Sequence, residues 1–444
     1  MTKKRKDIFI VGFALFAIFF GAGNLIFPPS LGVVSGKHWA LAAFGFLLTD
    51  PVLPILGIIA TSKAGGKAED LGKRVSLTFS RTLGAISILV VGPLFSIPRT
   101  AATTHEIAIQ PTLSSIPLII TSIIFFVLTY LLAVNQSNVI DKIGKYLTPA
   151  LLIILTIIII TSIVNPIGSR IEPEPNNYFL IGFEEGYQTM DALGASLMAG
   201  IVLTDLTFRG YKDRKEQEYM TNRAGLVAGA LLLFIYGGLT YVGATGSSVF
   251  RPDMPRVDLL LALVNELFGS AGAIAISIVV SLACLTTSVG LTATTANYFN
   301  DISNGKVSYK FMVIAVTICS FFLSLLGVEG LISIAVPVLS TIYPVIIVLI
   351  LMTLFDKYIP SGATYTGAVL GAFIVSFIIN LNKTFKILNS SMKLIKKLPL
   401  YENGFPWIVP AIVLSVLFMI YSKLKYKNNG INICLLYTSD AADE

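Results

Sequence analysis

One stretch decides the fold: Phe19-Phe20-Gly21-Ala22-Gly23-Asn24-Leu25-Ile26-Phe27-Pro28-Pro29, set inside an otherwise apolar block. Two glycines weaken a helix here, and two prolines remove backbone donors and clash with the preceding turn. Unwound backbone at membrane depth persists only where protein or a water-filled cavity surrounds it. Its free carbonyls can bind a cation, and the N-terminus of the resumed half-helix can face a carboxylate. The stretch therefore predicts a broken membrane helix with a binding site, the alternative being a kink that only serves helix packing.

Apolar blocks recur along nearly the whole chain. Of its 444 residues, 55% are hydrophobic and 13% are charged, whereas about a quarter are charged in a soluble domain. Each block approaches the roughly 20 residues with which a helix crosses a hydrocarbon core, and a barrel would show short alternating segments instead. We therefore predict an all-α integral membrane protein of about twelve transmembrane helices. The predicted spans are 8–35, 39–61, 79–101, 116–134, 143–164, 182–205, 223–245, 270–299, 308–327, 329–355, 362–381 and 405–422.

The net charge of +7 is best explained by membrane orientation. Lys and Arg gather in alternate short loops, which places both termini in the cytoplasm and gives no reason to expect a nucleic-acid partner. The Lys-rich segment 383–397 departs from this pattern, and is either an amphipathic segment on the outer surface or a sign of a miscounted span.

The chain shows little sign of enzyme chemistry. Cys284, Cys319 and Cys434 have neither metal nor disulfide spacing, and the membrane-depth segments lack an obvious His/Glu cluster or nucleophile–base pair. We expect no catalytic residue and no cofactor.

A second interruption runs from Gly186 to Ala195 and contains Asp191. An ionisable residue inside an apolar span is costly unless it faces a polar cavity or a partner. The alternative is that the span begins later and Asp191 caps it at the membrane interface. Because this break opens the sixth span, five spans after the first break, the pair is typical of transporters built from two repeats.

The eighth span carries a run of small and hydroxyl side chains from Ser281 to Thr295. Hydroxyls at this spacing can bond back to their own helix or pack against a neighbouring helix. The functional alternative is a sodium site, because adjacent Thr286 and Thr287 hydroxyls and nearby carbonyls supply oxygen ligands.

These segments resemble the bacterial branched-chain amino acid:cation symporter family over residues 7–425. The shared features are Phe-Gly-Ala-Gly-Asn-Leu-Ile-Phe-Pro-Pro at 20–29, Pro98-Arg99-Thr100-Ala101, Thr189-Met190-Asp191-Ala192-Leu193 and the Thr286-Thr287 region. The resemblance implies one transporter domain over 1–433 with a leucine-transporter-like fold. Its repeats would cover 8–164 and, inverted, 182–355, with discontinuous spans 1 and 6 and two additional helices over 362–422.

The resemblance also implies import of leucine, isoleucine and valine by sodium symport across the bacterial cytoplasmic membrane. Proton coupling in the same architecture is the alternative that Asp191 keeps open. The implied substrate-binding residues are Phe19, Gly21, Ala22, Gly23, Asn24, Thr189, Met190, Asp191, Ala192, Leu193 and Gly194. The implied sodium-binding residues are Ala17, Phe20, Ala283, Thr286 and Thr287.

Two further expectations concern the ends of predicted segments. Arg99 and Glu106 are placed in an outer vestibule beyond the third span, as part of a gate or as a solvated pair. Residues 434–444 differ in character from the Lys- and Asn-rich segment before them. They can be back-translated as a DNA-sequencing adapter, so we expect a non-native tail without function.

Overall fold

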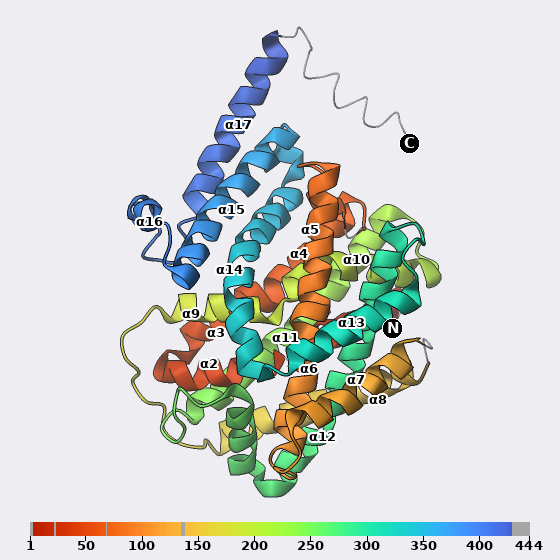
Figure 1. Ribbon diagram of the computed structural model, residues 1–444, viewed down its shortest axis with the longest axis vertical. Coiled ribbons are helices and arrows are strands. Elements are labelled where there is room, and N and C mark those ends of the chain that lie inside the picture. The colour runs from red at the N-terminus through yellow and green to blue at the C-terminus, as the bar shows by residue number, and fades with distance from the viewer. Residues whose placement is uncertain (1–2, 22–23, 68, 135–137, 429–444) are drawn as a thin grey trace.

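The computed structural model describes residues 3–21, 24–67, 69–134 and 138–428, and the predicted tail at 434–444 lies outside them. The described part is all-helical, without a strand (Figure 1). The first half contains α1 (Lys3–Phe19), α2 (Phe27–Ser35), η2 (Gly36–His38), α3 (Trp39–Leu47), η3 (Leu48–Val52), α4 (Leu53–Ala64), η4 (Asp70–Gly72), α5 (Leu77–Leu89), η5 (Val90–Leu94), α6 (Ser96–Thr104), η6 (His105–Ile109), α7 (Leu118–Val134) and α8 (Asn138–Val164). The second half contains α9 (Tyr178–Glu185), η7 (Gly186–Thr189), α10 (Asp191–Phe208), α11 (Arg214–Thr245), α12 (Arg256–Ile302), α13 (Tyr309–Ser324), α14 (Gly327–Leu354), η8 (Asp356–Tyr358), α15 (Gly362–Phe385), α16 (Asn389–Ile395) and α17 (Ile408–Asn428).

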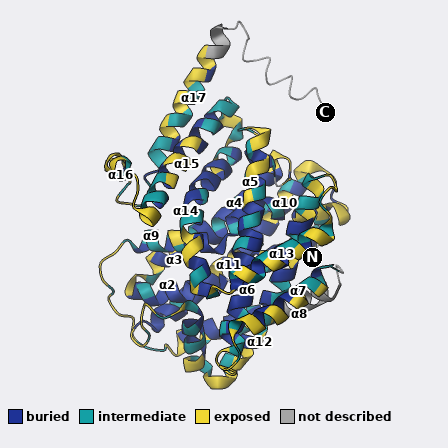
Figure 2. Cartoon of the chain, viewed as in Figure 1, coloured by how far each residue is buried: buried dark blue, intermediate teal, exposed yellow. Residues whose placement is uncertain are grey.

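The helices have the length and surface of membrane-spanning segments. Among the described residues, seven helical segments are long and apolar enough to cross a membrane, and four shorter apolar helices accompany them. Large apolar side chains are exposed along the outside of the bundle, as in α7 and α17, where water would disfavour them and lipid would not. Figure 2 shows buried residues concentrated around α11 and α6, and exposed ones along α17. The predicted multi-pass helical fold is confirmed.

The first span is broken as predicted. Helix α1 ends at Phe19, and α2 resumes at Phe27 with prolines in its first turn, where their missing N–H groups cost nothing. Within the described part of the break, the Gly21 N–H donates to the Phe19 carbonyl at 2.8 Å and the Asn24 N–H to the Gly21 carbonyl at 2.8 Å.

The sixth span is broken at Met190. Helix α9 continues as the short 3-10 turn η7, Met190 adopts a left-handed conformation with φ 63°, and α10 begins at Asp191. Because α1 contacts α10, the two interruptions are neighbours in space.

Two further spans are interrupted where the sequence analysis expected continuous helices. The second span changes direction at Asp50-Pro51 in η3, and the third at Gly92-Pro93 in η5. Proline removes a backbone donor and restricts the residue before it, which explains both interruptions. The third span also continues to Ile109, beyond its predicted end at 101.

The last two spans form a separate pair, α15 and α17, beside the main bundle (Figure 1). Gly367 and Gly371 allow this close contact, because a Cβ at Gly371 would lie 2.4 Å from the Pro410 carbonyl oxygen. The Lys-rich segment between these helices forms only the seven-residue α16, whose Ile395 is buried. The segment therefore lies at the surface, and α16 is too short to cross a membrane.

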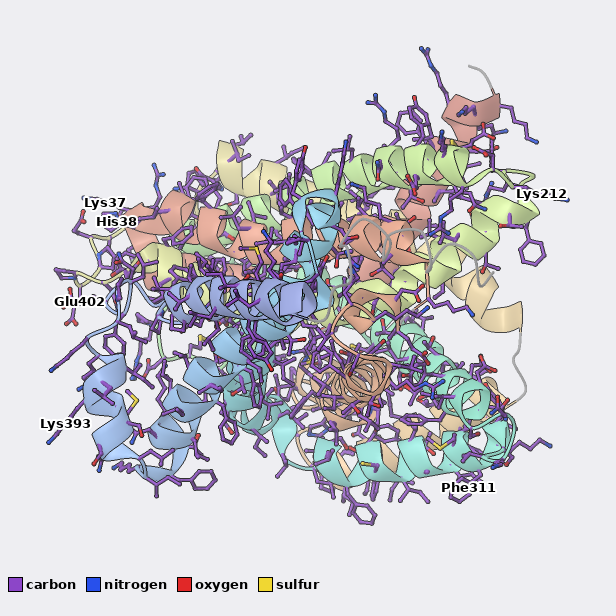
Figure 3. The ribbon with its side chains drawn as sticks, turned by 90° about the horizontal axis from the view of Figure 1, so that it is seen from above. Lys37, His38, Lys212, Phe311, Lys393 and Glu402 are labelled. Atoms are coloured by element: carbon purple, nitrogen blue, oxygen red, sulfur yellow. The ribbon has the colours of Figure 1, made fainter. Side chains whose placement is uncertain are left out.

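The loops alternate between two opposite edges of the bundle. In Figure 3, Lys37, His38, Lys393 and Glu402 lie along one edge, and Lys212 lies at the other. This distribution agrees with the predicted order of the spans.

Candidate functional site

A small cavity lies where the two broken helices meet. Its volume is about 60 Å³, which is enough for about four water molecules. An amino acid such as leucine has more non-hydrogen atoms than that, so this cavity is smaller than such a substrate. Its walls come from α1 and the first break, η5 and α6, η7 and α10, and α12. The lining residues are Ile18, Phe19, Gly21, Asn24, Val91, Ser96, Arg99, Thr100, Thr189, Met190, Asp191, Gly194, Met198, Thr287 and Leu291.

Most of the residues expected to bind substrate are brought together here. The cavity is lined by Phe19, Gly21, Asn24, Thr189, Met190, Asp191 and Gly194. Ala22 and Gly23 lie outside the described residues.

Ala192 and Leu193 differ from the expectation. They are buried in an apolar cluster that contains Leu339 and Tyr343, away from the cavity lining. Positions three and four apart share a helix face, so α10 turns Asp191, Gly194 and Met198 toward the cavity and turns the two intervening residues away from it.

The Asn24 side chain joins the two breaks. Its amide nitrogen donates to both carboxylate oxygens of Asp191, at 3.3 and 3.2 Å, and to the Phe19 carbonyl at 3.3 Å. Its amide oxygen accepts from Nη2 of Arg99 at 3.3 Å. Asp191 is therefore neither an interfacial cap nor an isolated charge, but the first residue of α10, partly exposed to the cavity.

Arg99 lies in this polar cluster, which corrects its expected place in an outer vestibule. It is 3% exposed, and its Nη1 donates to the Gln188 carbonyl at 2.8 Å. The extension of the third span to Ile109 places Arg99 within the helix, well before its end. A buried guanidinium is costly without partners, and here a carbonyl, an amide and the nearby Asp191 carboxylate supply them.

The residues expected to bind sodium occupy the adjoining parts of α1 and α12. Thr287 lines the cavity, and the Thr286 hydroxyl donates to the Ala283 carbonyl at 3.0 Å. Phe20 is buried and stacks on Phe16 with ring centroids 5.0 Å apart, and Ala17 lies in the last turn of α1. The Thr286 bond is the back-bonding that hydroxyls make in any helix, so the sodium assignment stays a prediction.

Three polar residues at or behind the cavity were not predicted as site residues. Ser96, whose hydroxyl approaches the Met190 sulfur at 3.5 Å, and Thr100 line the cavity from α6. Asp50 lies behind the cavity, is 0% exposed, and has Asp191 and Thr189 as neighbours of its carboxyl. The signal for Asp50 was present as an acidic residue before a proline inside an apolar span.

One polar cluster lies on the α2 side of the cavity. Arg256 pairs with Glu185 at 2.9 Å and with Glu329 at 2.7 Å. Its guanidinium lies 5.9 Å from the centre of the Phe27 ring, and that of Arg99 lies 5.1 Å from it. Arg99 of the cavity and Arg256 of this ion cluster therefore both lie next to the Phe27 ring.

A second polar cluster lies at the opposite ends of α1 and α10. Asp7 accepts from Nη1 of Arg209 at 3.3 Å and from the Tyr211 hydroxyl at 2.8 Å, and Lys4 pairs with Glu216 at 2.8 Å. The cavity is thus bounded on both sides by ion pairs between different helices.

Comparison with known proteins agrees with this geometry. A family model described as branched-chain amino acid transport protein matches residues 4–425. The branched-chain amino acid permease BraB of Bacillus subtilis is 37% identical over 421 residues, which cover 93% of this chain and 94% of BraB. The permease BrnQ of Escherichia coli K12 is 33% identical over 425 residues, covering 95% of this chain and 96% of BrnQ.

Solved structures support the fold. Mhp1, a nucleobase-cation-symport-1 family transporter, matches in a closed conformation with TM-score 0.58 at 13% identity, covering 93% of this chain and 92% of Mhp1. Its inward-facing conformation matches with TM-score 0.57, covering 93% and 91%. These are transporters of the leucine-transporter fold, which confirms the expected fold class, and the sequence relatives are named as permeases, not enzymes. On the extent of these matches, the chain belongs to the branched-chain amino acid transport protein family.

Proposed function

We propose that this protein imports leucine, isoleucine and valine across the bacterial cytoplasmic membrane by sodium symport. The observation that carries the proposal is the meeting of two broken helices at a cavity with one polar and one apolar part. Family membership and the printed function of the permease relatives support the choice of substrate.

The cavity suits a zwitterion with an aliphatic side chain. The Arg99 guanidinium attracts a carboxylate, and the Asp191 carboxylate attracts an ammonium group. Phe19, Met198 and Leu291 supply apolar walls. Such walls separate leucine, isoleucine and valine poorly, because one methylene group is worth only about 1–3 kcal/mol.

Transport would proceed by alternating opening of the two sides. Because the cavity is too small for substrate, the helices around it have to separate for entry and release. The distribution of basic loops favours both termini in the cytoplasm. In that orientation the Arg256 cluster is the outer gate, which closes the cavity from outside, and the Asp7–Arg209 cluster is the inner gate. Sodium bound near Ala283, Thr286 and the end of α1 would favour the conformation that binds substrate, through its different affinity for the two states.

Leucine uptake into proteoliposomes, with and without a sodium gradient at fixed pH, tests the proposal. We expect sodium to drive accumulation, and Thr287→Val, which keeps the shape but removes a ligand oxygen, to abolish sodium dependence or transport. Thr317→Val is the matched control, because that hydroxyl bonds back to Val313 on α13, away from the cavity lining. Unchanged sodium activation in Thr287→Val would contradict the sodium site.

Proton coupling is the second candidate, because Asp191 presents a carboxylate to the cavity. Uptake that requires a pH gradient and ignores sodium would establish it.

A further inference from the structure

Asp50 is a buried carboxyl group for which the proposed transport cycle has no use. It lies in η3, where the backbone leaves the helical conformation with φ −151° and ψ 107°. Its side chain is 0% exposed, and among the described residues neither carboxylate oxygen accepts a hydrogen bond, because the neighbouring Thr189 hydroxyl donates to the Gly186 carbonyl at 2.9 Å. A buried ionised carboxylate without a partner costs several kcal/mol or more, so the group demands a proton or a cation.

The polar and ionisable groups near Asp50 come from η7, α10, α11, α14 and α6. Thr189 of η7 and Asp191 of α10 lie at its carboxyl. Tyr236 of α11 and Tyr343 of α14 are uncharged phenols within electrostatic reach. Arg99 of α6 faces Asp191 and, among the described residues, is the cation near this carboxyl pair. One guanidinium against two carboxylates leaves one negative charge without compensation.

The neighbouring positions of two buried carboxyl groups identify what supplies the missing positive charge. Asp50 and Asp191 are close enough for a side-chain hydrogen bond, yet two ionised carboxylates have no proton to donate. Like charges at such a distance do not both ionise, and one shared proton turns repulsion into a hydrogen bond. A proton needs only these two oxygens, whereas sodium would need several more.

The proton belongs to Asp50. Asp191 accepts two hydrogen bonds from Asn24, faces Arg99 and borders the cavity, and each of these features stabilises its ionised form. Asp50 has none of them. We propose that Asp50 is a proton-binding site that donates a hydrogen bond to ionised Asp191 and so positions that carboxylate toward the cavity.

This arrangement makes the cluster of Asp50, Asp191 and Arg99 neutral before substrate enters. A zwitterion adds no net charge, so the proton stays on Asp50 while the ammonium group binds Asp191; this last assignment rests on the proposed function. Asp50 is then a positioning residue. Uptake should fall as rising pH removes its proton, by about tenfold for each pH unit beyond the midpoint, without any need for a pH gradient.

Infrared spectroscopy of the purified protein in lipid tests the proton directly. We expect a band from a buried protonated carboxyl in the wild type that is lost in Asp50→Asn and kept in Asp301→Asn, a matched change at an exposed position on α12. Asp50→Glu, which still carries a proton, should restore a carboxyl band. An unchanged band in Asp50→Asn, or its absence from the glutamate variant, would overturn the proposal.

The pH profile of leucine uptake, with equal pH on both sides and each variant normalised to its own maximum, is the second measurement. Asparagine keeps a donor toward Asp191 but has no proton to lose, so Asp50→Asn should lose the alkaline fall and Asp50→Glu should keep it. The same alkaline fall in Asp50→Asn as in the wild type would refute the role of Asp50. Failure of the proposed function would instead appear as absent sodium-driven uptake in the wild type, with the infrared band unaffected.

Discussion

Replacing Asn24 with leucine should weaken leucine transport strongly, because the Asn24 amide joins the two broken helices. The amide is 3% exposed and binds Asp191, Arg99 and the Phe19 carbonyl at 3.2–3.3 Å. Leucine has nearly the same shape but no polar atom, so the change isolates these hydrogen bonds from packing.

The expected magnitude follows from the two charged partners. A hydrogen bond to a charged group contributes about 1.5–3 kcal/mol, and these distances are at the long end of the range, so the lower value applies to each. Together they give about 3 kcal/mol, of which cavity water can restore about a third, leaving about 2 kcal/mol. At about 1.4 kcal/mol per factor of ten, the half-saturating leucine concentration should rise about 30-fold.

Initial rates of leucine uptake in proteoliposomes, measured over a range of leucine concentrations at saturating sodium, provide the assay. Asn380→Leu is the control, because Asn380 is also buried but bonds only within its own helix, to the Ser376 carbonyl at 2.9 Å. A half-saturating concentration within threefold of wild type for Asn24→Leu would show that the amide does not organise the site.

Two further predictions concern the elements around the cavity. Arg256→Gln removes the ion pairs with Glu185 and Glu329, which are partly exposed and so contribute about 1 kcal/mol each at most. We expect a thiol reagent to label the Ser96→Cys variant faster when Arg256→Gln is also present. Equal labelling rates would contradict the role of the Arg256 cluster as a gate. Gly367→Leu forces a side chain into the Leu414 carbonyl of α17, so we expect a clear loss of thermal stability in detergent. Gly290→Leu on α12 is the control, because Gly290 is exposed and a Cβ there meets nothing within 4 Å.

The sequence predicted the fold well because each membrane span appears in the sequence as a block of apolar residues. The predicted spans correspond to helices or helix pairs, and both Gly- and Asp-containing breaks lie where expected. The breaks at Asp50-Pro51 and Gly92-Pro93 carried the same kind of signal, but each falls in a block apolar enough to pass for a continuous span.

The site was predicted less completely because its contacts depend on tertiary structure. Hydropathy places Asn24 and Asp191 at breaks, yet nothing in either segment shows that one side chain binds the other. Arg99 was misplaced because the end of its span was set by the loss of apolar character at residue 101, whereas the helix continues as α6 and η6. A charged residue near an apparent span end is thus hard to distinguish from one at mid-depth.

The hydrogen bonds of the cavity also suggest how binding and closure are linked. Unwinding leaves backbone carbonyls without helical partners. In this conformation the Phe19 carbonyl accepts a hydrogen bond from Asn24, and the Gln188 carbonyl accepts one from Arg99. A substrate carboxylate that binds Arg99 therefore competes with the Gln188 carbonyl of η7, whereas an ammonium group can bind Asp191 beside the retained Asn24 amide, because a carboxylate accepts several hydrogen bonds. The exchange at Arg99 loosens a bond between the third span and the sixth span and replaces it with a bond to substrate. Because η7 carries the bond that is lost, the sixth span is the element whose position substrate binding would change first.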